Sequence, residues 1–355
     1  MTVLSVAGKQ IGDEEPMERN IGSDSRIFAE FNPEDIKAGV RLPDLCEELL
    51  NRQKIDWPRL ADGYKAVAQS QFRTVDCGDF SVVLQFNPQR IVSSGARLDP
   101  ASIAARPCFL CPANLPGEQQ GILYRRDFLV LCNPFPIFSQ HFVISHRIHR
   151  PQFLEGQIDT VLLLARDLAP SLAVFYNGPF CGASAPDHLH FQACPAGSLP
   201  IEAQIDDGRP VPVIARHVSA SVCQAERLGR AVLVIKGSDL TDLEGAVKKV
   251  LTVMKAADVS GAEPMLNLHA AYQGGAWRLL LFPRGKNRPD LYDREGSDRI
   301  LISPASVEMG GLLVVPVERD FRKLNAELVR HIYREVSVAP ECLQSWTDQL
   351  SGGGR

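Results

Sequence analysis

Three polar side chains alternate with two apolar ones in the short stretch His188-Leu189-His190-Phe191-Gln192. This alternation has the period of a β-strand with one polar face, so we expect the two histidines and the glutamine to project together while Leu189 and Phe191 enter a core. A single histidine on a strand is more often a hydrogen-bonded structural residue. Two imidazoles and an amide on one face favour phosphoryl or nucleotidyl transfer, because neutral imidazole is a nucleophile at pH 7.

A turn of small residues precedes this strand and contains Gly178, Gly182 and Ser184. Backbone N–H groups in such a turn can approach an anion closely, so the turn is a candidate phosphate cradle. Upstream, Arg90 follows a predicted strand at 80–87. It is either a solvated surface residue or part of a loop that grips phosphate.

The pair Cys108-Phe-Leu-Cys111 has the spacing of half a zinc site, because two thiolates three residues apart can bind one soft divalent ion from a single turn. A redox dithiol would give the same string. A zinc site needs two further ligands from elsewhere in the chain.

The composition excludes several classes of protein. The chain has 355 residues, a net charge of -4 and a pI near 6.1, which does not favour a general nucleic-acid binder. We expect no secretory signal, no membrane span and a cytoplasmic location. Nine cysteines scattered through a long chain predict free or metal-bound thiols rather than a disulfide scaffold.

Hydrophobic periodicity divides the chain into segments. A polar tail is expected at 1–25 and a helical lead-in at 26–71, where apolar residues recur at helical spacing. Further strands are predicted at 129–133, 141–145, 172–176, 231–235, 265–272, 277–283 and 312–316, and helices at 157–169, 240–257 and 321–336. The order of strand, helix and hairpin in the second part echoes the first, as a duplication would.

Together these residues resemble the galactose-1-phosphate uridylyltransferase branch of the histidine-triad (HIT) superfamily, which also contains the diadenosine tetraphosphate phosphorylases and the GDP-hexose phosphorylases. The branch motif corresponds to Asn177-Gly178 followed by Gly182-Ala-Ser184-Ala-Pro186-Asp-His188-Leu-His190-Phe-Gln192. The resemblance also covers Asn87-Pro-Gln-Arg90, Arg106-Pro-Cys108-Phe-Leu-Cys111, His141-Phe-Val-Ile144, Phe282-Pro-Arg284 and Ser306-Val-Glu-Met-Gly-Gly-Leu312. It spans about 72–336.

The resemblance implies an α+β, HIT-like fold with two duplicated antiparallel sheet halves and packed helices. The catalytic half would comprise 72–212 and the second half 213–345, followed by a tail at 346–355.

The resemblance also implies the roles of individual residues. His190 would attack the α-phosphorus of a nucleotide, Gln192 would hydrogen-bond the phosphoryl oxygens, and Ser184 would stabilise charge on the transferring group. The implied substrate-binding residues are Asn177, Gly178, Gly182, Arg90 and Arg284. The implied metal ligands, in a closed structural zinc site, are Cys108, Cys111, His149 and His188, with His146 as the alternative to His149.

The implied activity is a nucleotidyltransferase of the phosphorylase type. The donor would be a nucleoside diphosphate sugar or a dinucleoside polyphosphate, the acceptor inorganic phosphate or a sugar phosphate, and the assembly a possible homodimer. Two alternatives stay open, namely a hexose-1-phosphate uridylyltransferase and a metal-stabilised nucleotide-binding module without turnover. A hydrolase is disfavoured by Gln192, which stands where the sister hydrolases carry a third histidine.

Overall fold

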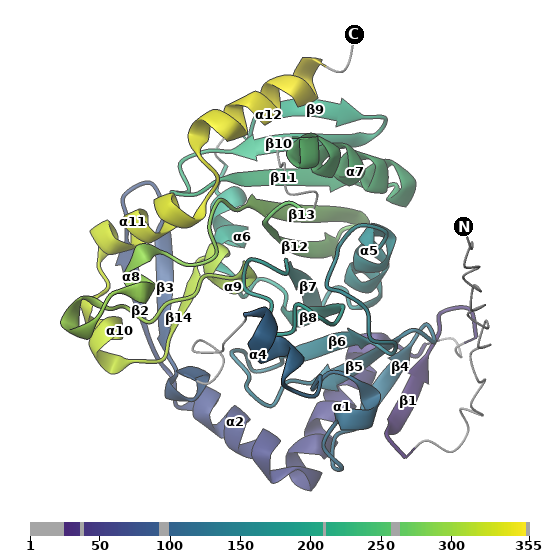
Figure 1. The fold of residues 1–355 in the computed structure, drawn as a ribbon. Helices are drawn as coiled ribbons and strands as arrows, with labels where there is room; N and C mark the ends of the chain where they lie inside the picture. Colours follow the sequence, from purple (N-terminus) through teal and green to yellow (C-terminus); the bar gives the residue numbers. More distant parts are fainter. Residues whose placement is uncertain (1–24, 36–38, 92–98, 209–210, 257–262, 353–355) are drawn as a thin grey trace, which may run out of the picture.

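The computed structural model of the protein describes residues 25–35, 39–91, 99–208, 211–256 and 263–352. These residues form one eleven-stranded sheet, a separate three-stranded sheet and helices packed around both (Figure 1). The tail predicted at 1–25 lies outside the described residues as far as residue 24.

The large sheet is antiparallel except at one edge, where β1 pairs in parallel with β4. In spatial order its strands are β1 (Ile27–Phe31), β4 (Gly121–Tyr124), β5 (Phe128–Cys132), β6 (Phe142–His146), β8 (His190–Pro195), β7 (Leu172–Asn177), β12 (Leu266–Gln273), β13 (Ala276–Pro283), β11 (Val232–Gly237), β10 (Ala220–Ala225) and β9 (Val213–His217). Strand β1 lies in the lead-in that was predicted to be helical.

The large sheet contains the same arrangement twice. The first half runs in the order β4-β5-β6-β8-β7 and the second in the order β9-β10-β11-β13-β12. A helix follows the third strand of each half, α5 (Ile158–Asp167) in the first and α7 (Leu240–Ala256) in the second. The halves join through antiparallel pairing of β7 with β12. The predicted duplication is therefore present in the fold, but the two halves form one continuous sheet because these strands satisfy each other's backbone hydrogen bonds.

Alternate residues of the large sheet supply two cores, one on each face. In β11, Leu233 and Ile235 pack with α5 and α7, while Val232 and Val234 pack with the small sheet on the opposite face. This is the period of a strand buried on both sides. The other α-helices in the described residues are α1 (Leu42–Asp56), α2 (Pro58–Ala68), α4 (Pro100–Ala104), α6 (Pro200–Ile205), α8 (Asp290–Asp293), α9 (Ser306–Met309), α10 (Glu318–Lys323), α11 (Ala326–Val336) and α12 (Pro340–Gly352).

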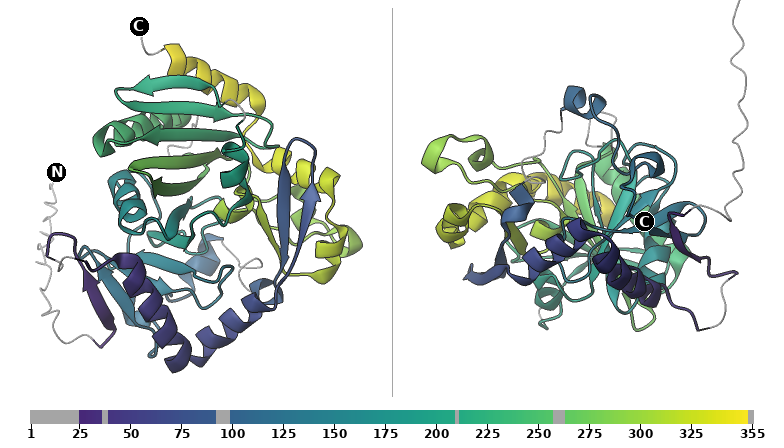
Figure 2. Two further views of the ribbon diagram at one scale, coloured as in Figure 1. Left: turned by 180° about the vertical axis from the view of Figure 1, so that it is seen from behind. Right: turned by 90° about the horizontal axis from the view of Figure 1, so that it is seen from below.

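The small sheet joins segments from both ends of the chain. Its order is β14 (Leu312–Val315), β3 (Ser81–Phe86) and β2 (Gln71–Asp76), with β14 parallel to β3. Helices α1 and α2 form a V between the large sheet and the small sheet (Figure 2, left). The lead-in therefore connects the two sheets.

The structure corrects two predictions near the C-terminus. The tail expected at 346–355 belongs to helix α12 as far as Gly352. Trp346 and Leu350 are buried in the core that also contains residues of α5 and α7. The helix expected at 321–336 is divided between α10 and α11. The second of these begins after Asn325, whose side-chain oxygen caps it by accepting the N–H of Leu328. Among the described residues, no helix has both the length and the apolar character needed to cross a bilayer.

A buried carboxylate ties the second half to the first. Glu263 accepts a hydrogen bond from the Tyr176 hydroxyl at 2.5 Å and others from the backbone N–H groups of Leu154 and Glu155. Burial raises the pKa of Glu263 to about 7. Because this carboxyl binds its proton more tightly in the folded chain than in the unfolded chain, its ionisation reduces stability as the pH rises from about 4.5 through about 7.

We therefore expect Glu263→Gln to be more stable than the wild type at pH 8 by roughly 1–3 kcal/mol and to lose this advantage near pH 5. The glutamine keeps an acceptor for Leu154, and the Tyr176 hydroxyl can donate to the carbonyl of Gln152, which lies 3.3 Å away. Urea unfolding at the two pH values measures the difference, with Glu341→Gln, at an exposed position on α12, as control. An equal stability difference at both pH values would contradict this assignment.

Candidate functional site

A pocket of about 550 Å³ lies where β8, the preceding turn, the second half and α2 meet. Six residues that were predicted to form the site line it, namely Arg90, Asn177, Gly182, Ser184, His190 and Gln192. Apolar side chains cover a further part of its wall, including Leu110, Leu115, Leu131, Ile137 and Val143. The pocket therefore offers polar, cationic and apolar surface to one ligand.

His190 is the first residue of β8, and its ring orientation follows from one hydrogen bond. Its Nδ1 lies 2.8 Å from the carbonyl oxygen of His188. A carbonyl only accepts, so Nδ1 carries the proton and Nε2 keeps a free lone pair. Only 3% of His190 is exposed, and burial lowers its pKa to about 4. The ring is a neutral imidazole with a defined tautomer.

The buried side chain of Gln152 fixes the backbone of His190, and sequence analysis missed it. Its Oε1 accepts the N–H of His190 at 2.7 Å, and its Nε2 donates to the carbonyls of His190 and Asn177 at 2.9 and 3.0 Å. One amide thus holds β8 against the end of β7. In the sequence Gln152 is a single glutamine after Pro151, outside any segment of hydrophobic periodicity, so no pattern there predicts its burial or its contacts.

Gln192 is oriented by His141. The N–H of Ile137 donates to His141 Nδ1 at 3.1 Å, which leaves the proton of the neutral ring on Nε2. That Nε2 lies 2.9 Å from Gln192 Oε1 and donates to it. Burial lowers the pKa of His141 to about 3, so this donor stays neutral. The carbonyl end of Gln192 is therefore occupied by the protein, and its NH₂ group faces the pocket as a donor.

Four arginines line the pocket, and of these Arg90 was among the predicted substrate-binding residues. Arg90 donates to the carbonyl of Phe135 at 2.8 Å. Arg106 donates to the carbonyl of Ser184 at 3.2 Å and pairs with Asp187 at 3.3 Å. The other two are Arg59 and Arg288. Four guanidinium groups in one pocket favour an anionic ligand with several phosphates.

The turn before β8 serves both the pocket and the packing of the two halves. Gly182 has a φ of +102° and lies so close to Ala305 that a Cβ would stand 2.4 Å from that side chain. Gly178 is not among the lining residues; a Cβ there would stand 2.7 Å from the carbonyl oxygen of Leu266. Gly182 thus faces the pocket, while Gly178 permits the close approach of β12.

The side chain of Asn177 joins the halves. Its Oδ1 accepts from the N–H of Ser306 at 2.8 Å and from Asn267 Nδ2 at 3.1 Å. Asn177 lines the pocket, but its side-chain oxygen is already engaged with the second half.

Arg284 was predicted to contact substrate, but it is not among the lining residues, and only 4% of it is exposed. All its donors have acceptors in the chain, on Asn267 Oδ1 and the carbonyls of Pro304, Val336, Lys286 and Asn287. This geometry does not support a direct phosphate contact. Arg284 instead holds Asn267, which contacts Asn177.

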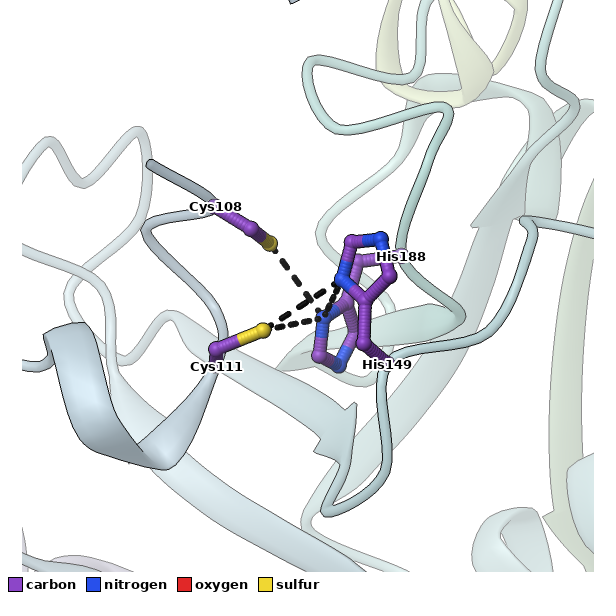
Figure 3. A group of neighbouring side chains, drawn as sticks. All are labelled: Cys108, Cys111, His149 and His188. Carbon is purple, nitrogen blue, oxygen red and sulfur yellow. Dashed lines mark hydrogen bonds between the residues drawn. The ribbon is translucent and has the colours of Figure 1, made fainter. Parts of the chain in front are cut away.

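Beside the pocket, Cys108, Cys111, His149 and His188 converge with all four ligand atoms within 4.8 Å of one another (Figure 3). Cys108 Sγ lies 3.3 Å from His188 Nδ1, and Cys111 Sγ lies 3.3 Å from His149 Nδ1. The two Nδ1 atoms are 3.3 Å apart. In a tetrahedral zinc site, bond lengths of about 2.0–2.3 Å place ligand atoms roughly 3.3–3.8 Å apart. The cluster therefore has the size and donor set of a zinc site.

The contacts around this cluster set the tautomer of one ligand. His188 Nε2 donates to the carbonyl of His146 at 2.7 Å, which leaves the lone pair of Nδ1 directed at the cysteines. Asp187 Oδ2 lies 3.9 Å from His149 Nε2. The His188 carbonyl accepts from His190, so one residue links the cluster to the pocket.

This arrangement bears on two sequence-based expectations. His149 rather than His146 joins the cluster, because the His146 ring accepts the N–H of Ile148 at 3.0 Å and lies edge-on to Phe128. His188 precedes β8 and reaches the cysteines, so it does not share a face with His190 and Gln192 as strict alternation predicted.

The fold is α+β with two repeated sheet halves, and comparison with known proteins finds the same fold elsewhere. Residues 49–195 match a family model described as a domain of unknown function, DUF4922. No curated protein sequence matches the chain.

The structure of yeast Ap4A phosphorylase Apa2 in complex with AMP superposes with a TM-score of 0.55 at 15% identity, over 83% of this chain and 96% of that one. The same enzyme in complex with Ap4A gives a TM-score of 0.50 at 15% identity, over 79% and 96% of the two chains. A uridylyltransferase mutant covers 67% and 94% at 14% identity, but its TM-score of 0.35 is too low for a structural argument. The predicted HIT-like α+β fold is thus confirmed by its similarity to the fold of Ap4A phosphorylase.

Proposed function

We propose that the protein is a nucleotidyltransferase of the phosphorylase type, with His190 as the nucleophile. One observation carries this proposal: the unprotonated Nε2 of His190 belongs to a ring held in a pocket that also contains the Gln192 amide and several arginines. A nucleophile beside fixed donors for phosphoryl oxygens is the arrangement that covalent nucleotidyl transfer requires.

The first step forms a bond between His190 Nε2 and the α-phosphorus of the donor. The P–O bond to the leaving group breaks, and the leaving oxygen takes the bonding electron pair. In the second step an oxygen of inorganic phosphate attacks the same phosphorus, and the P–N electron pair returns to Nε2. The proton on Nδ1 stays in its hydrogen bond to the His188 carbonyl throughout, so it stabilises the positive charge on the substituted ring.

Donors around His190 would bind the charge on the transferring group. His141 holds the carbonyl oxygen of Gln192 and leaves its NH₂ group for a ligand, and Ser184 and Gly182 line the same pocket. Arg106, held by Asp187, adds a positive charge beside Ser184. Such pre-oriented donors stabilise the transition state without reorganising during the reaction.

The pocket favours a donor with several phosphates, because four arginines line it and apolar side chains offer a surface for a base. Yeast Ap4A phosphorylase, whose fold is similar, has been solved with Ap4A and with AMP, which supports a nucleotide with a polyphosphate chain. A dinucleoside polyphosphate is therefore the first candidate donor.

We propose that zinc occupies the cluster of Cys108, Cys111, His149 and His188. Four protein ligands complete a tetrahedral shell, so zinc would supply structure and no open coordination position. The cluster would hold the turn 182–188 against the loop that carries Cys108 and Cys111. It would also fix the His188 carbonyl, which accepts the hydrogen bond from His190.

The test is the intact mass of the protein after incubation with a panel of dinucleoside polyphosphates and nucleotide sugars. We expect a gain of one nucleotide with a competent donor, followed by release when inorganic phosphate is added. Nucleotide binding without a mass gain for any donor would favour the binding module instead. Release at the same rate with and without phosphate would favour a hydrolase.

A further inference from the structure

Helix α2, in the lead-in outside the two sheet halves, packs directly on the loop that carries pocket residues. A Cβ on Gly63 would stand 2.5 Å from the carbonyl oxygen of Pro134, so the helix backbone lies against this loop. Two hydrogen bonds secure the contact: the Tyr64 hydroxyl donates to the carbonyl of His141 at 3.2 Å and accepts its N–H at 3.1 Å. His141 in turn orients Gln192, so α2 is tied to the site through the backbone of one residue.

The same helix presents Arg59 to the pocket. Its guanidinium lies 4.9 Å from the centre of the Phe135 ring. Across the described residues, Arg59 has no hydrogen-bond acceptor and no carboxylate partner, and its side chain is exposed. Stacking on an aromatic face leaves the in-plane N–H donors of an arginine open to a ligand.

Phe135 connects this arginine to a second one. Its ring lies under Arg59, while its carbonyl accepts from Arg90 at 2.8 Å. Its N–H donates to Asn133 Oδ1 at 2.9 Å, which fixes the loop. Both arginines thus contact the same residue of one short loop, and both line the pocket. Two like charges that contact one residue repel each other, and an anion bound by both would relieve this repulsion.

The depth of each residue indicates which part of a ligand it meets. His190, which would receive the α-phosphorus, lines the pocket and is buried, with 3% of the residue exposed. Arg59 is exposed and therefore lies toward the mouth. The part of the donor that leaves must face the mouth, because it exits that way.

From this placement, and on the basis of the proposed function, we propose that Arg59 binds the phosphates of the donor beyond the one transferred, and so selects donors with a long phosphate chain. The lead-in helices are then part of the substrate site as well as of the scaffold. The ligand class is an inorganic or organic polyphosphate of three or more phosphates.

The experiment compares Arg59→Ala, Arg59→Lys and the wild type with donors of two, three and four phosphates. A lost arginine–phosphate contact raises KM about tenfold, and we expect this for the four-phosphate donor, with little change for the nucleoside diphosphate. Arg59→Lys is expected to recover part of the loss. Arg52→Ala is the matched control, since Arg52 is exposed on the neighbouring helix α1 and pairs with Asp56 outside the pocket. An equal change in KM for all donors would overturn the inference.

Inorganic tripolyphosphate separates this inference from the proposed function. Its binding, measured by calorimetry, needs no turnover, and we expect Arg59→Ala to weaken it about tenfold. Unchanged binding would overturn the role of Arg59 even if the enzyme is active. A wild type that forms no adduct with any donor would instead overturn the proposed function, while the tripolyphosphate result still tests Arg59.

Discussion

Replacement of His190 by alanine is expected to abolish nucleotidyl transfer, with a loss on the order of 10⁴-fold or more in rate. The variant lacks the atom that would bond to phosphorus, and Gln192 has no lone pair of comparable nucleophilicity to replace it. Nucleotide binding should fall far less, because the arginines and the apolar wall remain. The expected signature is thus a loss of the covalent adduct with binding retained.

The measurement is single-turnover formation of the adduct by mass spectrometry, beside nucleotide binding by calorimetry. His331→Ala is a suitable control, because His331 lies on α11 with 41% of its side chain exposed and pairs with Glu335 outside the pocket. A melting temperature for each variant separates loss of chemistry from loss of folding. Adduct formation at the wild-type rate in His190→Ala would exclude this histidine as the nucleophile.

Local periodicity predicted much of the fold because many strands alternate or are continuously apolar over their whole length. The hairpin of β12 and β13 around Gly274 and Gly275 is one example, and helix α7 at Leu240–Ala256 is another. The pairing of β7 with β12 could not be predicted in this way. It depends on which edges remain free after each half has folded, and the sequence of either strand alone does not encode that.

Side-chain contacts over long sequence separations account for most of what was missed at the site. Gln152 reaches the backbone of His190 across 38 residues, and Tyr64 reaches His141 across 77. The local sequence around Gln152 or Tyr64 does not distinguish either residue from a glutamine or tyrosine with no contact to the site. Arg284 shows the opposite case. It was predicted to contact substrate, but acceptors in three other segments, on Asn267, Pro304 and Val336, occupy its donors together with two carbonyls of its own loop.

The C-terminus shows how burial overrides composition. The final residues are rich in serine and glycine, which favours a tail. Trp346 and Leu350 nevertheless lie one helical turn apart, and both are buried against β9 and α7. The apolar area that they bury stabilises the helix as far as Gly352.

Metal removal is expected to give the largest effect on stability. Cys108→Ser should release the bound ion and lower the melting temperature by roughly 10 °C, because the lost metal–ligand bonds are worth several kcal/mol. The exposed Cys342→Ser on α12 is the control, and it should keep both the metal and the stability.

The same change should also slow adduct formation, although no cluster residue lines the pocket. The His188 carbonyl orients the His190 ring, and His188 is itself held between the metal cluster and the carbonyl of His146. Loss of the proposed metal would therefore loosen the proposed nucleophile, His190, through His188 alone. Elemental analysis should find about one zinc per chain in the wild type, and chelation of the wild type should reproduce both defects. Retention of full metal content in Cys108→Ser would show that this thiol is not a ligand, and a wild type without metal would reject the zinc site itself.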